Sequence, residues 1–131
     1  MSADFLDSNV LLYLAWTEDR KASIIEDMLR GTPFVSAQVL NEIASVLRRK
    51  RKLDWGAING FIDDLLPVVT VLPISEVTNR SARTIAERYH FAVYDAVIIA
   101  SALEGDCVRL ITEDMQHGQR IGDLTIVNPF R

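Results

Sequence analysis

Four acidic residues of the 131-residue chain have types and positions that could support chemistry together. They are Asp7, Glu42, Asp95 and Asp114. Each has an ordinary explanation by itself, because aspartates commonly cap helices or close turns and a glutamate commonly lies on the solvent side of a helix. As a group, the four acids would repel one another unless a cation joined them. Oxygen ligands with no neighbouring His or Cys favour Mg²⁺ or Mn²⁺ over zinc, and such an ion can orient a phosphodiester and activate water.

The elements that must position the four acids are short apolar strands separated by helices. Strands are predicted at residues 3–6, 34–35, 68–72, 108–111 and 124–127. Helices are predicted at residues 10–16, 18–29, 54–65, 76–90 and 95–105, with a further helix that Ser36 caps and that runs into the basic residues 48–52. Strands that are apolar throughout and alternate with helices predict an α/β fold, with a mostly parallel sheet and helices on both faces.

This arrangement brings the four acids towards one edge of the predicted sheet. Asp7 and Asp114 each come just after a predicted strand, and the carboxyl ends of parallel strands share the edge where ligands bind. Asp95 stands at the predicted start of a helix, which can face the same edge. Glu42 lies about one turn into the helix that follows the second strand. The capping and solvation explanations account for each acid separately but not for this convergence.

Four short motifs contain these acids. They are Asp7-Ser8-Asn9-Val10-Leu11-Leu12-Tyr13, Ser36-Ala37-Gln38-Val39-Leu40-Asn41-Glu42, Tyr94-Asp95-Ala96 and Thr112-Glu113-Asp114. In this order and at these intervals they resemble the PIN-domain nucleases, and most of all the VapC-type toxins of bacterial type II toxin–antitoxin pairs. The resemblance extends over residues 5–127, nearly the whole chain, and the family often has Thr where this chain has Ser8.

The resemblance implies a PIN-like three-layer sandwich and an Mg²⁺-dependent endoribonuclease that hydrolyses RNA. It also implies a cognate antitoxin protein and a homodimer. By the same resemblance, the metal-binding and catalytic residues would be Asp7, Glu42, Asp95 and Asp114. Asn9 and Thr112 match polar positions that support the site. Glu113 is a second acid beside Asp114, and only the family's Thr-x-Asp spacing favours Asp114 over it.

Two other function classes remain open at the level of sequence. The first is a catalytically inactive PIN-like module that binds RNA or protein. The second is a phosphoacceptor domain or a haloacid-dehalogenase-like phosphatase, which also places an Asp after the first strand. Phosphatases of that kind have a second Asp where this chain has Asn9. Neither member of this class explains Glu42 together with Asp95.

Composition adds limits on compartment and partners. Length and the absence of a linker predict one domain over residues 1–131, and a single cysteine excludes an intramolecular disulfide framework. The apolar stretches are too short to span a bilayer and no signal peptide is evident, so we expect a cytoplasmic protein without membrane contact.

The net charge of −4 argues against binding nucleic acid through bulk positive charge, although without the four acids the charges balance. The basic run from Arg48 to Lys52 could contact an RNA backbone or be a solvated helix end.

Overall fold

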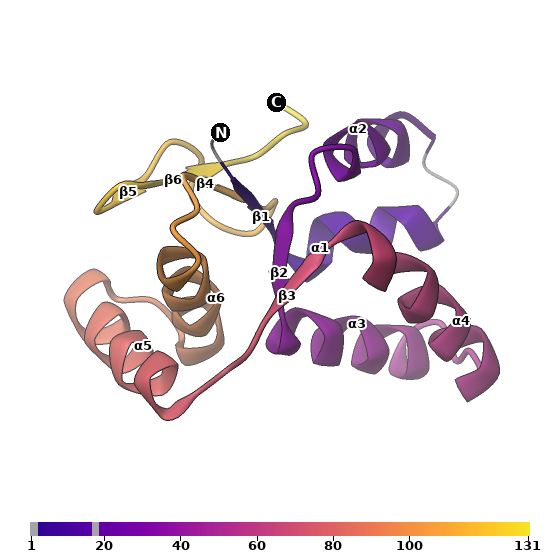
Figure 1. Cartoon of the computed structure of the whole chain (residues 1–131), viewed down its shortest axis with the longest axis horizontal. Coiled ribbons are helices and arrows are strands. Elements are labelled where there is room, and N and C mark those ends of the chain that lie inside the picture. The colour runs from indigo at the N-terminus through magenta and orange to yellow at the C-terminus, as the bar shows by residue number, and fades with distance from the viewer. Residues whose placement is uncertain (1–2, 17–18) are drawn as a thin grey trace.

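A computed structural model describes residues 3–16 and 19–131, and its centre is a six-stranded sheet (Figure 1). The strands are β1 (Asp4–Leu6), β2 (Phe34–Ser36), β3 (Thr70–Leu72), β4 (Arg109–Ile111), β5 (Arg120–Ile121) and β6 (Leu124–Val127). Their order across the sheet is β3-β2-β1-β4-β6-β5, and all neighbours are parallel except the antiparallel pair β5–β6. The predicted α/β fold with a mostly parallel sheet is therefore confirmed.

Helices cover both faces of this sheet. They are α1 (Ser8–Leu11), α2 (Asp19–Leu29), α3 (Ala37–Arg49), α4 (Trp55–Leu65), α5 (Glu76–Tyr89) and α6 (Val93–Glu104), with 3-10 turns at Leu12–Ala15 and Leu66–Val68. Figure 1 shows the α5–α6 pair on one side of the strands and α1 to α4 on the other. This is the expected three-layer sandwich. Within the described ranges, none of the helices has both the length and the apolar surface that a membrane span requires.

Three helices start where capping residues predict. The side chains of Ser36, Asp54 and Ser75 each accept a hydrogen bond from the backbone N–H three residues further on. Such caps satisfy donors that the first helical turn leaves without partners. The cap at Ser36 matters for the site, because it fixes the start of α3, the helix that carries Glu42.

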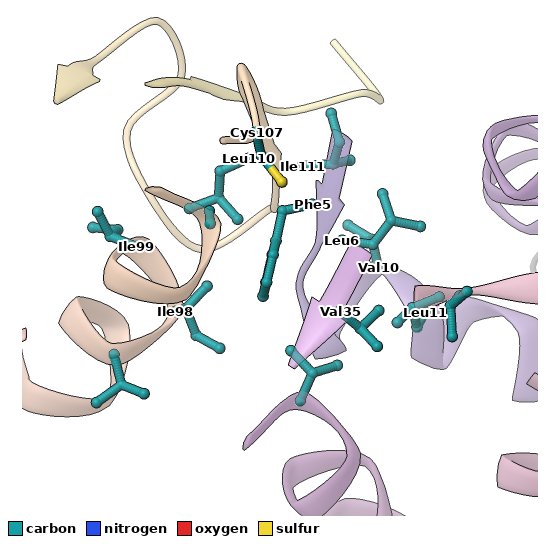
Figure 2. Close-up of a cluster of buried hydrophobic side chains, with 14 of the residues drawn as sticks. Phe5, Leu6, Val10, Leu11, Val35, Ile98, Ile99, Cys107, Leu110 and Ile111 are labelled. Atoms are coloured by element: carbon teal, nitrogen blue, oxygen red, sulfur yellow. The ribbon is translucent and has the colours of Figure 1, made fainter. Parts of the chain in front are cut away.

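The core lies between the sheet and its helices (Figure 2). Phe5 and Leu110, from the neighbouring central strands β1 and β4, are fully inaccessible to solvent. In α6, every residue from 96 to 102 is buried, as expected for a helix that is apolar on all sides. Close packing therefore fixes the central strands and α6, and with them the carboxyl ends of β1 and β4.

The helix predicted to begin at Asp95 begins two residues earlier, at Val93. Its N-cap is Ala92, which has no side chain able to cap, so the prediction of Asp95 as first residue is wrong. An acidic residue is favoured both at the N-cap and inside the first turn, and the sequence does not separate these positions. The consequence is functional: the carboxylate of Asp95 is not used as a helix cap.

A short hairpin was also missing from the sequence prediction. β5 and β6 are joined by Gly122 and Asp123, and Gly122 adopts a positive φ of 59°, which glycine tolerates without strain. β5 has only two residues, and one of them is an exposed arginine, so it carries no apolar pattern. The sheet therefore ends in one antiparallel edge strand.

Other boundaries differ by a few residues. The first helix begins at Ser8 and not at residue 10, because Asp7 caps it, and it continues as a 3-10 turn. The strand expected at 68–72 begins at Thr70, since Pro67 lies in a 3-10 turn that includes Val68. The helix predicted from Glu18 is described from Asp19 onward, and Glu18 itself lies outside the described residues.

Candidate functional site

The candidate site lies where the strand order changes direction. From β1 the chain proceeds outward to β2 and β3, and it then returns to place β4 on the other side of β1. Leu6 pairs with Ile111 at the carboxyl ends of these two strands, and the backbone N–H of Asp7 donates to the carbonyl oxygen of Ile111 at 3.0 Å. In open α/β sheets, the carboxyl ends of strands at such a change of direction form a natural binding crevice.

Asp7 follows β1 directly and is held by hydrogen bonds on both carboxylate oxygens. Oδ1 accepts from the backbone N–H of Ser8 at 2.7 Å, which makes Asp7 the N-cap of α1. Oδ2 accepts from the Thr112 hydroxyl at 2.9 Å and from the Asn9 amide at 3.2 Å. The side chain is only 5% exposed, so its orientation is fixed by the protein and not by solvent. The capping explanation of Asp7 is correct, but it accounts for only one of three bonds.

Asn9 and Thr112 connect Asp7 to Asp114. The Asn9 amide nitrogen donates to Asp114 Oδ2 at 3.1 Å and also lies 3.0 Å from the Thr112 hydroxyl. The backbone N–H of Glu113 donates to Asn9 Oδ1 at 3.0 Å and so fixes which way the amide points. These contacts link the segment after β1 with the segment after β4. Asp114 itself is exposed and lies in a bend, with no helix following it.

Glu42 and Asp95 approach this pair from two helices. Glu42 lies on α3 and accepts a hydrogen bond on Oε1 from the Ser8 hydroxyl at 3.2 Å. Ser8, at the position where the PIN-domain nucleases often have Thr, therefore contacts one of the four acids through its hydroxyl. Asp95 is half-buried in the first turn of α6. The four acids thus come from four separate segments: those after β1 and β4, and helices α3 and α6.

The electrostatics show that the four acids share one environment. Burial, opposed by hydrogen bonds from Ser8 and Thr112 and reinforced by the charges of Asp95 and Asp114, raises the pKa of Asp7 to about 6. Burial and the charge of Asp7 raise the pKa of Glu42 to about 7. Burial and the charge of Asp114 raise the pKa of Asp95. The charges of Asp7, Asp95 and Asp114 therefore each make ionisation of at least one other of the four acids more costly.

No basic side chain neutralises the four acids within residues 3–16 and 19–131. The ion pairs found there involve other acids, namely Asp4 with Arg109, Asp27 with Arg30 and Glu113 with Lys21. In the same ranges, no three His, Cys, Asp or Glu side chains are already arranged to hold a metal ion. An uncompensated, oxygen-only donor set at a binding crevice nevertheless suits a hard divalent cation, which would relieve the repulsion.

Glu113 points into a different cluster from Asp114. Its carboxylate accepts from the Tyr13 hydroxyl at 2.6 Å and from the Lys21 ammonium at 2.7 Å. Burial alone would raise the pKa of Glu113, but these two bonds outweigh it and the pKa is lowered. Lys21 also lies over the rings of Tyr13 and Phe130, 4.7 and 5.0 Å from their centroids. Sequence reasoning missed this cluster, since nothing in the spacing links α2 to a residue 92 positions later.

Comparisons with known proteins identify the family and the fold. The PIN domain family model matches residues 5–120. A comparison with curated proteins found no match.

Solved structures share the fold at low sequence identity. They include VapBC2 from Rickettsia felis bound to a promoter DNA fragment (18% identity, TM-score 0.71, covering 95% of this chain and 96% of that chain). A toxin–antitoxin complex from Klebsiella pneumoniae has 19% identity and a TM-score of 0.72, covering 98% of both chains. VapC20 from Mycobacterium tuberculosis, described as a sarcin–ricin loop cleaving toxin, has 18% identity and a TM-score of 0.69, covering 86% of this chain and 90% of that chain. The family match spans most of the chain, and the chain belongs to the PIN domain family.

Proposed function

We propose that the protein is a metal-dependent endoribonuclease whose active site is formed by the four acids. The observation that carries the proposal is that Asp7 and Asp114 meet after β1 and β4 while Glu42 and Asp95 approach them from α3 and α6. None of the four has a basic partner among the described residues. Burying mutually repelling carboxylates costs stability, and such a cost is typical of functional sites. A helix cap or a solvated surface acid would need neither the burial of Asp7 nor the raised pKa of Glu42.

The four acids would hold Mg²⁺ or Mn²⁺, which when bound would supply positive charge for a scissile phosphate and acidify a water molecule. The protein's own part is positioning. Asn9 and Thr112 hold the carboxylates of Asp7 and Asp114 in one orientation, and Ser8 does the same for Glu42. We assign the fourth position to Asp114 and not to Glu113, because Lys21 and Tyr13 already engage the Glu113 carboxylate.

RNA is the proposed substrate, and the toxin of a toxin–antitoxin pair is the proposed biological role. Family membership supports a nuclease, and the VapC20 structure is that of a toxin that cleaves the sarcin–ricin loop, an RNA. Complexes of toxin with antitoxin recur among the similar folds, which supports a cognate antitoxin for this chain. We also propose that the protein forms a homodimer and is cytoplasmic. Light scattering tests the homodimer.

The test is cleavage of a random-sequence RNA by wild type and Asp95→Asn, each with Mg²⁺ and with EDTA. Asp95 is suitable because it is not a helix cap, so its amide variant removes charge without removing a capping bond. We expect cleavage only by wild type with Mg²⁺. The matched control is Asp63→Asn, which removes an exposed acid from α4 and should leave cleavage unchanged.

Two results would overturn the proposal. One is equal cleavage by wild type and Asp95→Asn, and the other is cleavage that EDTA does not change. A protein that binds RNA without cleaving it under any of these conditions would instead be the inactive binding module.

A further inference from the structure

A hollow of about 370 Å³ lies beside Glu42. Its lining consists of Gln38, Asn41, Glu42 and Ser45 from α3 and Tyr94 from the first turn of α6. We call it the α3 hollow. Glu42 is the only one of the four acids in this lining, so the hollow adjoins the proposed active site without coinciding with it. Its volume lies within the usual range for small-ligand sites, which begins at roughly 300 Å³.

The lining of the α3 hollow has the chemistry of a nucleobase site. Two carboxamides and a hydroxyl, from Gln38, Asn41 and Ser45, can both donate and accept hydrogen bonds, as the edge of a base requires. Tyr94, which is 65% exposed, offers an aromatic side chain at the edge of this lining. Single-stranded RNA is recognised in this way, with unstacked bases lying on aromatic side chains and read along their edges.

Charge along α3 indicates where the backbone of such a strand would run. The acids repel phosphate at one end of the hollow, whereas the other end leads to the basic residues 48–52. Arg49 is joined to the lining directly, because its Nε donates to the Ser45 hydroxyl at 2.9 Å. Along the helix axis, Arg49 lies about 10 Å from Glu42. A neutral base therefore fits beside the acids, and a neighbouring phosphate fits at Arg49.

Two other members of the basic run have different contacts. The guanidinium of Arg48 lies over the ring of Trp55, and that of Arg51 lies over the ring of Trp16, 5.8 and 4.2 Å from the centroids. These contacts commit both groups in part to aromatic partners within the protein. Arg49 is thus the member of the run that is coupled to the α3 hollow.

We propose that the α3 hollow binds one base of a single-stranded RNA substrate next to the cleavage site and gives the nuclease a base preference at that position. Tyr94 stacks on the base, Asn41 and Gln38 read its edge, and Arg49 binds the phosphate that follows. The inference rests on the proposed ribonuclease function and extends it from a substrate class to a specificity subsite.

A binding measurement tests the stack separately from catalysis. Fluorescence anisotropy of a labelled, short, random-sequence single-stranded RNA is followed without metal, in an Asp7→Asn background that cannot cleave. Adding Tyr94→Ala should weaken binding about 5- to 150-fold, the range expected from loss of one base stack, whereas Tyr94→Phe should bind as before. Equal binding by the Ala and Phe variants overturns the proposed stack. Arg49→Gln should weaken binding and reduce the salt slope by about 0.7, the value for one phosphate on a single strand.

A second readout tests base preference. Random-sequence RNA is cleaved with Mg²⁺ by wild type, Tyr94→Ala, Asn41→Ala and Arg49→Gln, and the cut ends are sequenced. We expect a preferred base at one position beside the cut, flattened in the first two variants and retained in Arg49→Gln. Cleavage by wild type with the same base profile in all variants overturns the α3 hollow as a subsite while leaving the ribonuclease proposal intact. No RNA cleavage and no RNA binding by any protein overturns both.

Discussion

Replacing Asp7 by Asn should make the metal-free protein more stable at alkaline pH and leave it nearly unchanged at acid pH. Asp7 is 5% exposed, has no basic partner among the described residues, and lies among other acids. Ionising it in the folded protein is therefore costly, whereas ionising it in the unfolded chain is not. The asparagine variant keeps the shape and removes the charge.

The magnitude follows from the pKa of Asp7, which is about 6 in the folded protein against 3.8 for an unperturbed aspartate. Because the folded pKa is the higher one, the unfolded state loses its proton first. The native state therefore loses stability as pH rises from about 4 to about 6, and the loss is complete above that range. This difference between the folded and the unperturbed pKa of Asp7 corresponds to about 3 kcal/mol. Weakened hydrogen bonds from Thr112 and Asn9 to the new amide offset about 1 kcal/mol of this gain.

We therefore expect Asp7→Asn to raise the free energy of unfolding by about 2 kcal/mol at pH 8 and to change it by less than about 1 kcal/mol at pH 4. The assay is urea denaturation in EDTA at both pH values, with Asp63→Asn as an exposed control that should show no pH-dependent difference. A variant no more stable than wild type at pH 8 would show that the charge of Asp7 does not destabilise the fold. A stability difference that is the same at both pH values would show that the effect does not come from ionisation of Asp7.

Further predictions concern the segment after β4. Asp114→Asn should abolish metal-dependent RNA cleavage, while Glu113→Gln should retain it. A time course of RNA cleavage by both variants compares them. Loss of activity in both variants, or in Glu113→Gln alone, would contradict the assignment of Asp114 as the fourth acid. Lys21→Met should lower stability only slightly and leave the metal affinity unchanged, as expected for a partly exposed ion pair, and a thermal melt with and without Mg²⁺ measures both quantities. Thr112→Val should lower the free energy of unfolding by about 1–3 kcal/mol, because the buried Asp7 carboxylate loses a donor, and urea denaturation at pH 8 checks this value.

The strand–helix alternation and the position of the site could be predicted from sequence because both depend on local patterns. Largely apolar strands such as β4, expected from Val108 and found from Arg109 to Ile111, and capping residues such as Ser36 are visible without knowledge of partners. General topology then predicts that the carboxyl ends of parallel strands share one edge. Asp7 and Asp114 do lie close together there, since the Asn9 amide donates to both carboxylates.

What could not be predicted depends on contacts between distant residues. Whether Asp95 caps a helix or lies in its first turn is decided by the backbone at Ala92, which follows the left-handed residue His90 at the end of α5. The choice between Glu113 and Asp114 is decided by Lys21, whose position relative to β4 is a result of helix packing. Spacing along the chain contains neither piece of information.

The most direct test of the central claim, that the four acids form a divalent-metal site, is a calorimetric titration of Mg²⁺ into the metal-free protein. We expect saturable binding to wild type at millimolar Mg²⁺ or below, and loss of that binding in Asp7→Asn. Absence of saturable binding to wild type at millimolar Mg²⁺, or equal binding by wild type and Asp7→Asn, would contradict the central claim.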